Sequence, residues 1–244
     1  MYTVRAPAKL TLSLRITGTR PDGYHLLDAE MVTLDFGDTL VISDGDGLEV
    51  VGPRAAGVPT GDDNLVRRAL TVTGRRAHVR LDKQVPAGAG LGGGSADAAA
   101  VLRWAGCRDL GVAAGLGADV AFCLVGGRAR VRGVGEAVEP LPFQQRIFTL
   151  LVPPVPVNTA EVYGAWDALG RPMAGNGSAN DLEPAALAVA PALAEWRDRL
   201  AEVTGRVPQL AGSGGSWFVE GDFPGEGRIV ARTVSAAAAG AVRG

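Results

Sequence analysis

The chain of 244 residues is poor in cysteine, in aromatic residues and in lysine. Its two cysteines, Cys107 and Cys123, are too few for a disulfide scaffold and stand among apolar neighbours, so we expect reduced core residues. No apolar run approaches the ~20 residues that span a bilayer. The first seven residues lack the apolar region of a secretory signal. We therefore expect a cytoplasmic protein that does not bind a membrane.

The chain also has no strong excess of charge of either sign, because its formal net charge is only −2. The nearest basic cluster, between residues 67 and 76, has no interleaved aromatic residues, so nucleic acid is not an expected partner. Only two of the 24 basic residues are lysines, Lys9 and Lys83. A compact ammonium fits where a forked guanidinium does not, which makes both lysines candidates for crowded sites. For Lys83, the sequence leaves open the alternative that a lysine stands at this position by chance.

Glycine, in contrast, is abundant and concentrated in one run, Pro86-Ala87-Gly88-Ala89-Gly90-Leu91-Gly92-Gly93-Gly94-Ser95-Ala96. A strand is predicted over 77–85 and a helix after the run, with Ser95 as its N-cap. Glycines allow close approach and positive φ, and a helix N-terminus presents unpaired N–H groups, so this context favours a phosphate site. The run is neither a Walker A loop nor a Rossmann turn, because the residues that define those motifs are absent. A plain flexible connection is the alternative.

The rest of the chain reads as a mixture of strands and helices without an internal repeat. A half-buried strand is predicted over 4–16, a second β segment over 26–43 and a strong strand over 147–152. Asn158 with Glu161 predicts a helix start of the capping-box type. Further helices are predicted over 64–74, 184–203 and 228–239, and Leu210 to Ser216 is a second glycine-serine loop that either closes a cleft or makes a tight turn.

Three separated segments, Ala6 to Leu12, the glycine run and Leu210 to Ser216, stand in an order that resembles the GHMP kinase superfamily. Within it the chain is most similar to the kinases that act on 4-diphosphocytidyl-2-C-methyl-D-erythritol. That similarity rests on Arg20 to His25, Asp38 to Leu40, Asp63 to Leu65, Leu116 to Val120 and Gly133 to Glu136.

The resemblance implies a two-lobed α+β fold with an active site between the lobes. The N-terminal lobe, residues 1–146, is expected to be of the ribosomal protein S5 domain 2-like type and to carry the ATP loop. The C-terminal lobe, residues 147–244, is expected to be ferredoxin-like and trimmed. The implied activity is ATP-dependent phosphorylation of the 2-hydroxyl of the cytidine diphosphate methylerythritol substrate, with Mg²⁺, by a monomer or homodimer.

The resemblance also implies roles for individual residues. Lys9 and Asp119 match the catalytic pair, and the run from Pro86 to Ala96 would bind ATP. A carboxylate must accept or orient the alcohol proton, and a fixed cation must stabilise the charge on the transferring phosphoryl group, so these residue types suit the reaction. Tyr24 and His25 fall at the cytidine-binding position. Ser95 is a candidate contact for Mg²⁺ or a β-phosphate oxygen.

Thr11 departs from the pattern, because the family usually carries asparagine there beside the catalytic lysine. We assign Thr11 to the substrate site, where it retains only a hydroxyl. This departure and the trimmed C-terminal half keep two alternatives open. One is a GHMP kinase acting on another small alcohol, and the other is a catalytically weak nucleotide-binding paralogue.

Overall fold

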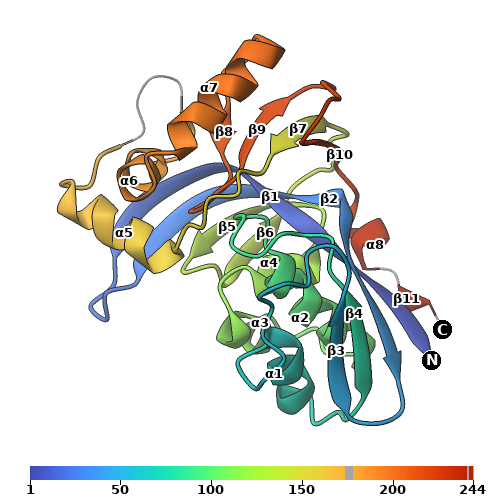
Figure 1. The fold of residues 1–244 in the computed structure, drawn as a ribbon. Coiled ribbons are helices and arrows are strands. Elements are labelled where there is room, and N and C mark those ends of the chain that lie inside the picture. Colours follow the sequence, from blue (N-terminus) through green and yellow to red (C-terminus); the bar gives the residue numbers. More distant parts are fainter. Residues whose placement is uncertain (174–177, 241, 244) are drawn as a thin grey trace.

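The computed structural model describes residues 1–173, 178–240 and 242–243, which form two sheets with helices packed on them (Figure 1). The strands are β1 (Tyr2–Thr19), β2 (His25–Ser43), β3 (Gly47–Val51), β4 (His78–Asp82), β5 (Arg128–Gly133), β6 (Ala137–Pro140), β7 (Ile147–Leu151), β8 (Gln209–Leu210), β9 (Trp217–Glu220), β10 (Arg228–Arg232) and β11 (Val242–Arg243). The helices are α1 (Leu65–Val72), α2 (Gly93–Trp104), α3 (Leu110–Leu116), α4 (Val120–Val125), α5 (Thr159–Ala168), α6 (Glu183–Val189), α7 (Leu193–Thr204) and α8 (Ala236–Ala239).

The first sheet is built around two long antiparallel strands, β1 and β2. Its order is β11-β1-β2-β4-β3, while β5 pairs with β2 and carries β6 at its other edge. Helices α1 to α4 pack on this sheet, and their apolar side chains share one core with it. Figure 1 shows β1 and β2 continuing out of this lobe and along the second one.

The second sheet has the order β10-β7-β9-β8, with every neighbouring pair antiparallel. Helices α5, α6 and α7 form an apolar core with one of its faces. A ferredoxin-like unit runs βαββαβ, but here residues 221–227 connect β9 to β10 without a second helix. In this connection Phe223 packs against the core. The trimming expected from the sequence stays a prediction.

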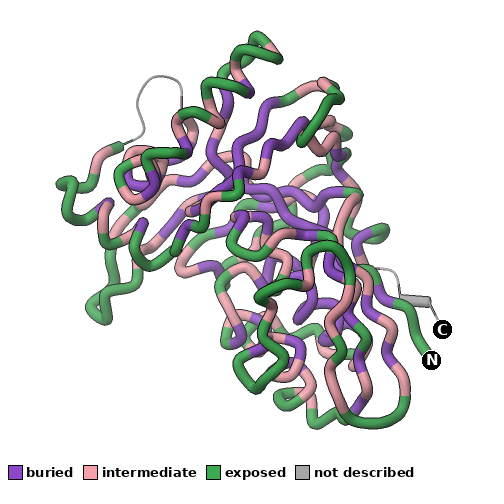
Figure 2. Tube along the Cα trace, viewed as in Figure 1, coloured by how far each residue is buried: buried purple, intermediate pink, exposed green. Residues whose placement is uncertain are grey.

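A third apolar core joins the two sheets, and it makes β1 more deeply buried than the sequence predicts. Residues 6–11 are buried without alternation, whereas the alternating pattern predicted a half-buried strand. The difference arises because the second sheet covers the face of β1 that would otherwise meet water. Phe148 and Phe218 provide much of that contact, with ring centroids 5.8 Å apart. Figure 2 shows the continuous buried path along these strands.

An irregularity in the β1–β2 pairing decides where Lys9 points. The register shifts between Pro7 and Lys9. Before the shift Ala6 faces the core under the helices, and after it Ala8 and Leu10 face the second sheet. Such irregularities change the face on which following side chains lie. Lys9, offset by one residue from Ala8 and Leu10, therefore faces the helix side, where the glycine loop lies.

The two lobes are joined by more than one chain crossing. Leu14 of β1 forms a bridge with Asn180, and Leu34 of β2 forms one with Thr233. Strand β11 returns to pair with β1, so the end of the described chain lies beside its beginning. We propose that the lobes divide near residue 147, where the second sheet begins.

Two helix predictions from the sequence are wrong in extent. The helix predicted over 184–203 is two helices, α6 and α7, because Pro191 lacks the N–H that a continuous helix needs. The helix predicted over 228–239 is strand β10 followed by the short helix α8, because β10 pairs with β7 along its whole length. Tertiary pairing outweighs local helix propensity at that edge of the sheet. None of the helices in the described parts of the chain has the length and apolar character to cross a membrane.

Candidate active site

Lys9 and Asp119, the predicted catalytic pair, lie side by side between the lobes. The Lys9 Nζ lies 3.1 Å from Asp119 Oδ2, and it donates a hydrogen bond of 3.1 Å to Thr11 Oγ1. Lys9 and Thr11 are buried, whereas the Asp119 side chain is 30% exposed. The ammonium is therefore held by two neighbours, and the carboxylate remains accessible to a ligand.

Asp119 occupies the N-cap position of α4 without acting as a cap. Its side chain accepts no hydrogen bond from the first turn of that helix. Asp109, which precedes α3, does cap its helix, because its carboxylate accepts from the N–H groups of Gly111 and Val112. A capping aspartate gains about 1 kcal/mol from such bonds. The Asp119 carboxylate gives up that gain and points to Lys9 instead, which is the geometry expected of a functional residue.

The glycine loop fits closely against both lobes. Gly90 has φ 74°, and a side chain there would begin 2.2 Å from the carbonyl oxygen of Ala211 in the second glycine-serine loop. Gly92 has φ 66°, and a Cβ there would lie 2.6 Å from Cγ of Lys9. Since any other residue would be strained and would displace these neighbours, both positions require glycine.

Helix α2 begins earlier than the sequence predicted and has no side-chain cap. Its N-cap is Gly92, and Ser95 lies in the first turn, so the prediction that Ser95 caps the helix is wrong. The run of glycines continues directly into helical geometry because the first intrahelical bond is already made by Ala96 N–H to Gly92 O. The first-turn N–H groups and the positive end of the helix dipole are thereby available to an anion.

A cavity of about 350 Å³ lies along this loop. Most of the predicted ATP-binding run lines it, as do Asp63, Asn64 and Leu65. Ser95 is among the lining residues, half-buried. The side chains of Leu91 and Ala96 are instead buried in the apolar cores. The run therefore forms one wall of the cavity, and the buried side chains of Leu91 and Ala96 attach this wall to the apolar cores.

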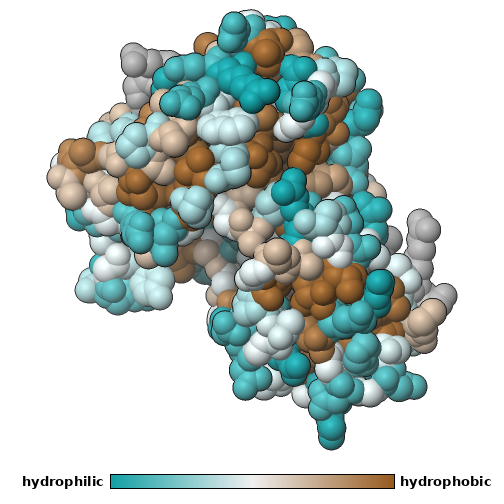
Figure 3. Space-filling model, viewed as in Figure 1, coloured by the Kyte–Doolittle hydropathy of each residue, from teal (hydrophilic) through white to brown (hydrophobic). Residues whose placement is uncertain are grey.

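A second, larger cleft of about 700 Å³ lies on the other side of Lys9. Its lining includes all the other predicted site residues, which are Lys9, Thr11, Tyr24, His25 and Asp119. The space-filling view shows the surface hollowed between the two lobes (Figure 3). Because Lys9 borders this cleft and packs on Gly92 of the loop, the Lys9–Asp119 pair lies between the two cavities.

At the far end of the cleft, His25 is held by side chains from α5. Its Nε2 lies 3.0 Å from Asp167 Oδ2, and its ring stacks on Tyr163 with centroids 4.9 Å apart. Desolvation would raise the pKa of Asp167, but hydrogen bonds and charges from His25 and Arg171 outweigh it and lower that pKa. Because a carboxylate only accepts, Nε2 carries the proton. Tyr24 is 63% exposed at the mouth of the cleft.

Tyr163 also lies close enough to Asp119 to interact with its charge. Burial, with a smaller contribution from the Asp119 carboxylate, raises the pKa of Tyr163 to about 12, so its phenol is neutral at physiological pH.

Burial likewise raises the pKa of the Cys123 thiol to about 12. This agrees with the prediction that Cys123 is an unreactive core residue, and both cysteines are free.

The second glycine-serine loop packs against the glycine run. The sequence left open whether this second loop closes a cleft or makes a tight turn. Ser216 is buried and donates a 2.6 Å hydrogen bond to the carbonyl of Ala89. Gly212 and Ser213 line the large cleft, and a Cβ on Gly212 would lie 3.5 Å from both Lys9 Nζ and Thr11 Oγ1. The loop is therefore both a tight turn and a wall of the cleft.

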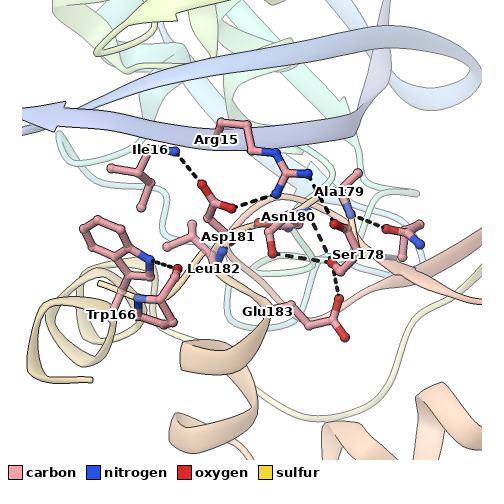
Figure 4. A network of polar contacts seen from close by, with 11 residues as sticks. Arg15, Ile16, Trp166, Ser178, Ala179, Asn180, Asp181, Leu182 and Glu183 are labelled. Atoms are coloured by element: carbon pink, nitrogen blue, oxygen red, sulfur yellow. Dashed lines mark hydrogen bonds and ion pairs between the residues drawn. The ribbon is translucent and has the colours of Figure 1, made fainter. Parts of the chain in front are cut away.

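Asn180 supports this second loop, and sequence reasoning missed it. Its buried amide donates to the carbonyls of Leu210 and Gly212 at 2.9 and 2.7 Å and accepts from Leu182 N–H. The adjacent Asp181 accepts from Ile16 N–H and Arg15 of β1 (Figure 4). These bonds tie the loop to the strand that carries Lys9.

The contribution of α5 was also missed. Asn158 caps this helix as predicted, since its side chain accepts from Ala160 and Glu161 N–H. The pattern did not indicate which face meets the cleft. Spacing of Tyr163 and Asp167 by one helical turn was the available signal, because residues four apart share a face.

Comparisons with known proteins agree with this geometry. The family model for the GHMP kinases N terminal domain matches residues 64–127. The chain is 41% identical to the 4-diphosphocytidyl-2-C-methyl-D-erythritol kinase of Dinoroseobacter shibae, with 94% of this chain and 89% of that protein covered. It is 40% identical to the enzyme of the same name from Paracoccus denitrificans, with 87% and 84% covered.

Solved structures extend the likeness to the whole fold. A crystal structure of 4-(cytidine 5'-diphospho)-2C-methyl-D-erythritol kinase matches with a TM-score of 0.74 and 29% identity, over 99% of each chain. Methanococcus jannaschii mevalonate kinase matches with a TM-score of 0.60 at 12% identity, over 96% of this chain and 98% of that one, which bears on the fold alone. The predicted two-lobed α+β fold is confirmed. From its relatives and its fold, the chain belongs to the 4-diphosphocytidyl-2-C-methyl-D-erythritol kinase family of GHMP kinases.

Proposed function

We propose that this protein transfers the γ-phosphoryl group of ATP to the 2-hydroxyl of 4-diphosphocytidyl-2-C-methyl-D-erythritol, a step of non-mevalonate isoprenoid precursor synthesis. The observation that carries the proposal is the position of the Lys9–Asp119 pair between a glycine-lined cavity and a larger cleft. ATP would lie along the glycine loop and the alcohol in the cleft. The relatives named above carry this activity in their names.

In the proposed reaction Asp119 accepts or orients the proton of the 2-hydroxyl as its oxygen attacks the γ-phosphorus. A bond forms between that oxygen and phosphorus, and the bond from phosphorus to the β–γ bridging oxygen breaks, leaving ADP. Lys9 stabilises the charge on the transferring oxygens. The 2-hydroxyl is a tertiary alcohol, so crowding makes the orientation of the attacking oxygen especially important.

The described residues fit a triphosphate and a magnesium ion bound mainly through it. Loop glycines and the uncapped start of α2 supply backbone N–H groups, and no group of three acidic, histidine or cysteine residues in the described chain forms a metal site of its own. Mg²⁺ in such enzymes takes one or two protein ligands besides the phosphates. We propose that Ser95 supplies one hydroxyl, and the bound ion would neutralise phosphate charge.

For the cytidine end, Tyr24 and His25 are the proposed contacts. The exposed Tyr24 ring offers a stacking surface, and His25 is held in one orientation by Asp167 and Tyr163.

The free thiols are consistent with a reducing compartment, and we propose that the enzyme acts in the cytoplasm as a monomer or homodimer.

The function is tested by ATP turnover with the purified protein, alone and with 4-diphosphocytidyl-2-C-methyl-D-erythritol, beside a panel of other small alcohols. Stimulation by the cytidine substrate alone is the expected result. Stimulation only by a different alcohol would replace the substrate while retaining a GHMP kinase. ATP binding without turnover on any alcohol would identify a nucleotide-binding paralogue.

His25→Ala is expected to raise the KM for the cytidine substrate by about tenfold, because it removes an oriented aromatic contact at that end of the cleft. The KM for ATP should change little, since His25 does not line the glycine-loop cavity. Steady-state kinetics with each substrate varied in turn measures both constants. Equal effects on the two KM values would remove His25 from the base site.

Thr11→Val is expected to lower kcat by about 10-fold to 100-fold, because it removes the acceptor of a hydrogen bond from a charged group. The Lys9 ammonium would then lose one of its two neighbours. Thr11→Ser is the matched control, since it retains the hydroxyl and should keep most of the activity. Equal kcat values for the valine and serine variants would show that Thr11 does not orient Lys9.

A further inference from the structure

Lys83 is the second of the two lysines, and the reaction derived above does not use it. Its side chain is 3% exposed, and its Nζ donates to Asp38 Oδ2 at 2.5 Å and to Asp97 Oδ2 at 2.8 Å. Asp38 and Asp97 are buried as well. The three residues form a buried cluster, the Lys83 cluster, next to the glycine loop, and Lys83 and Asp97 also line the cavity along that loop.

The cluster touches the chain on both sides of the loop. The other oxygen of Asp38, Oδ1, accepts the N–H groups of Gln84 and Val85 at 2.6 and 2.8 Å. These two residues lead directly into the loop at Pro86. Asp97 lies in the first turns of α2, directly after the loop. One ammonium group therefore connects the residues before the loop to the helix after it.

Stability alone does not account for such a cluster, because a buried ion pair seldom stabilises a fold more than apolar side chains of the same volume. Burial works to lower the pKa of Lys83, but the Asp97 and Asp38 carboxylates outweigh it and raise that pKa, so the ammonium stays charged. Burial raises the pKa of Asp97, and the charge of Lys83 opposes that rise. Oδ1 of Asp97 is buried without a hydrogen-bond partner among the described residues. Burying these three ionisable side chains costs free energy, which points to a geometric role for the Lys83 cluster.

The surroundings also explain why arginine does not replace this lysine. A Cβ placed on Gly93 would lie 3.2 Å from Lys83 Nζ and 3.1 Å from the Val85 side chain. A planar guanidinium is larger than an ammonium and needs room for its fork. The glycine at 93 and the lysine at 83 are thus matched to each other.

We propose that Lys83 is a positioning residue for ATP binding, because its bridge between Asp38 and Asp97 holds the two ends of the glycine loop at the separation that the triphosphate requires. The proposal rests on the proposed ATP site, but not on the identity of the alcohol. Lys83 acts through the loop backbone, so its effect on the conformation of the loop should exist before any nucleotide binds.

The test combines ATP binding with hydrogen exchange. Dissociation constants for ATP with Mg²⁺ are measured by calorimetry for the wild type, Lys83→Met and Lys83→Arg, without an alcohol. Both variants are expected to bind ATP at least about tenfold more weakly, because the loop is no longer preorganised. In the nucleotide-free protein, amides of residues 84–97 should exchange faster in both variants, while other core segments stay protected.

Arg128→Met is the matched control, because it removes a cation from a partly buried pair with Glu30 on the same sheet, away from both cavities. It should leave ATP affinity and loop exchange unchanged. Wild-type ATP affinity in Lys83→Arg, or weaker binding without faster loop exchange, would overturn the proposal. Loss of the folded state in both Lys83 variants would overturn it too, by assigning Lys83 to the core. Failure of the wild type to bind ATP would instead contradict the proposed function.

Discussion

Asp119→Ala is expected to lower kcat by about a thousandfold, because a positioned general base contributes on the order of 10²-fold to 10⁴-fold. The carboxylate is the only acidic group that contacts Lys9 in the described structure, and it lies on the wall of the large cleft. Turnover with saturating ATP and cytidine substrate measures the effect. Asp119→Asn should be nearly as slow, since an amide retains the shape but cannot take a proton.

Folding should survive this change, because the Asp119 side chain does not cap α4. Asp109→Ala provides the matched control, since it removes an aspartate at the same position of the neighbouring helix α3 that does cap. That variant should lose about 1 kcal/mol of stability and keep its kcat. An Asp119 variant with unchanged kcat, or one that is inactive because it unfolds, would contradict the assigned role.

Lys9→Ala is expected to lower kcat by about 10²-fold to 10³-fold, the range found when a preorganised group that stabilises transition-state charge is removed. Lys9→Arg should not rescue activity. The side chain is packed against Gly92 and faces Gly212, so a guanidinium has no room there. Single-turnover kinetics separates the chemical step from product release.

The double variant Lys9→Ala/Asp119→Ala tests whether the two residues act as a unit. Because groups that act together are not additive, its kcat should be close to that of the slower single variant. Circular dichroism and thermal unfolding would check that each protein is folded. Independent, multiplied effects of the two changes would show that Lys9 and Asp119 do not cooperate in one step.

Local patterns predicted the conformation of the glycine loop well because the properties it requires are local. Positive φ at Gly88, Gly90 and Gly92, and a helix start directly after them, follow from the absence of side chains in the run. The position of the helix start was still wrong by three residues. With several glycines in succession, the sequence pattern alone does not reveal which one leaves the helical conformation, and Ser95 was a misleading signal.

Side-chain contacts between residues far apart in the chain could not be predicted from local sequence patterns. The sequence singled out Lys83 by composition but did not indicate that Asp38, 45 positions away, is its partner. It identified His25, but Asp167 lies 142 positions further along the chain. Whether Asp119 caps a helix or meets Lys9 likewise depends on where α4 lies relative to β1. Each of these pairings is decided by how sheets and helices pack.

By itself, the sequence predicted a type of chemistry, through Lys9, the glycine run and Asp119, and it determined the kinase family through the order of its motifs. The tertiary structure alone decided the burial of β1 on both faces and the two-sided support of the glycine loop. The physical reason is that backbone conformation depends on neighbours in the chain, whereas burial and ion pairing depend on neighbours in space.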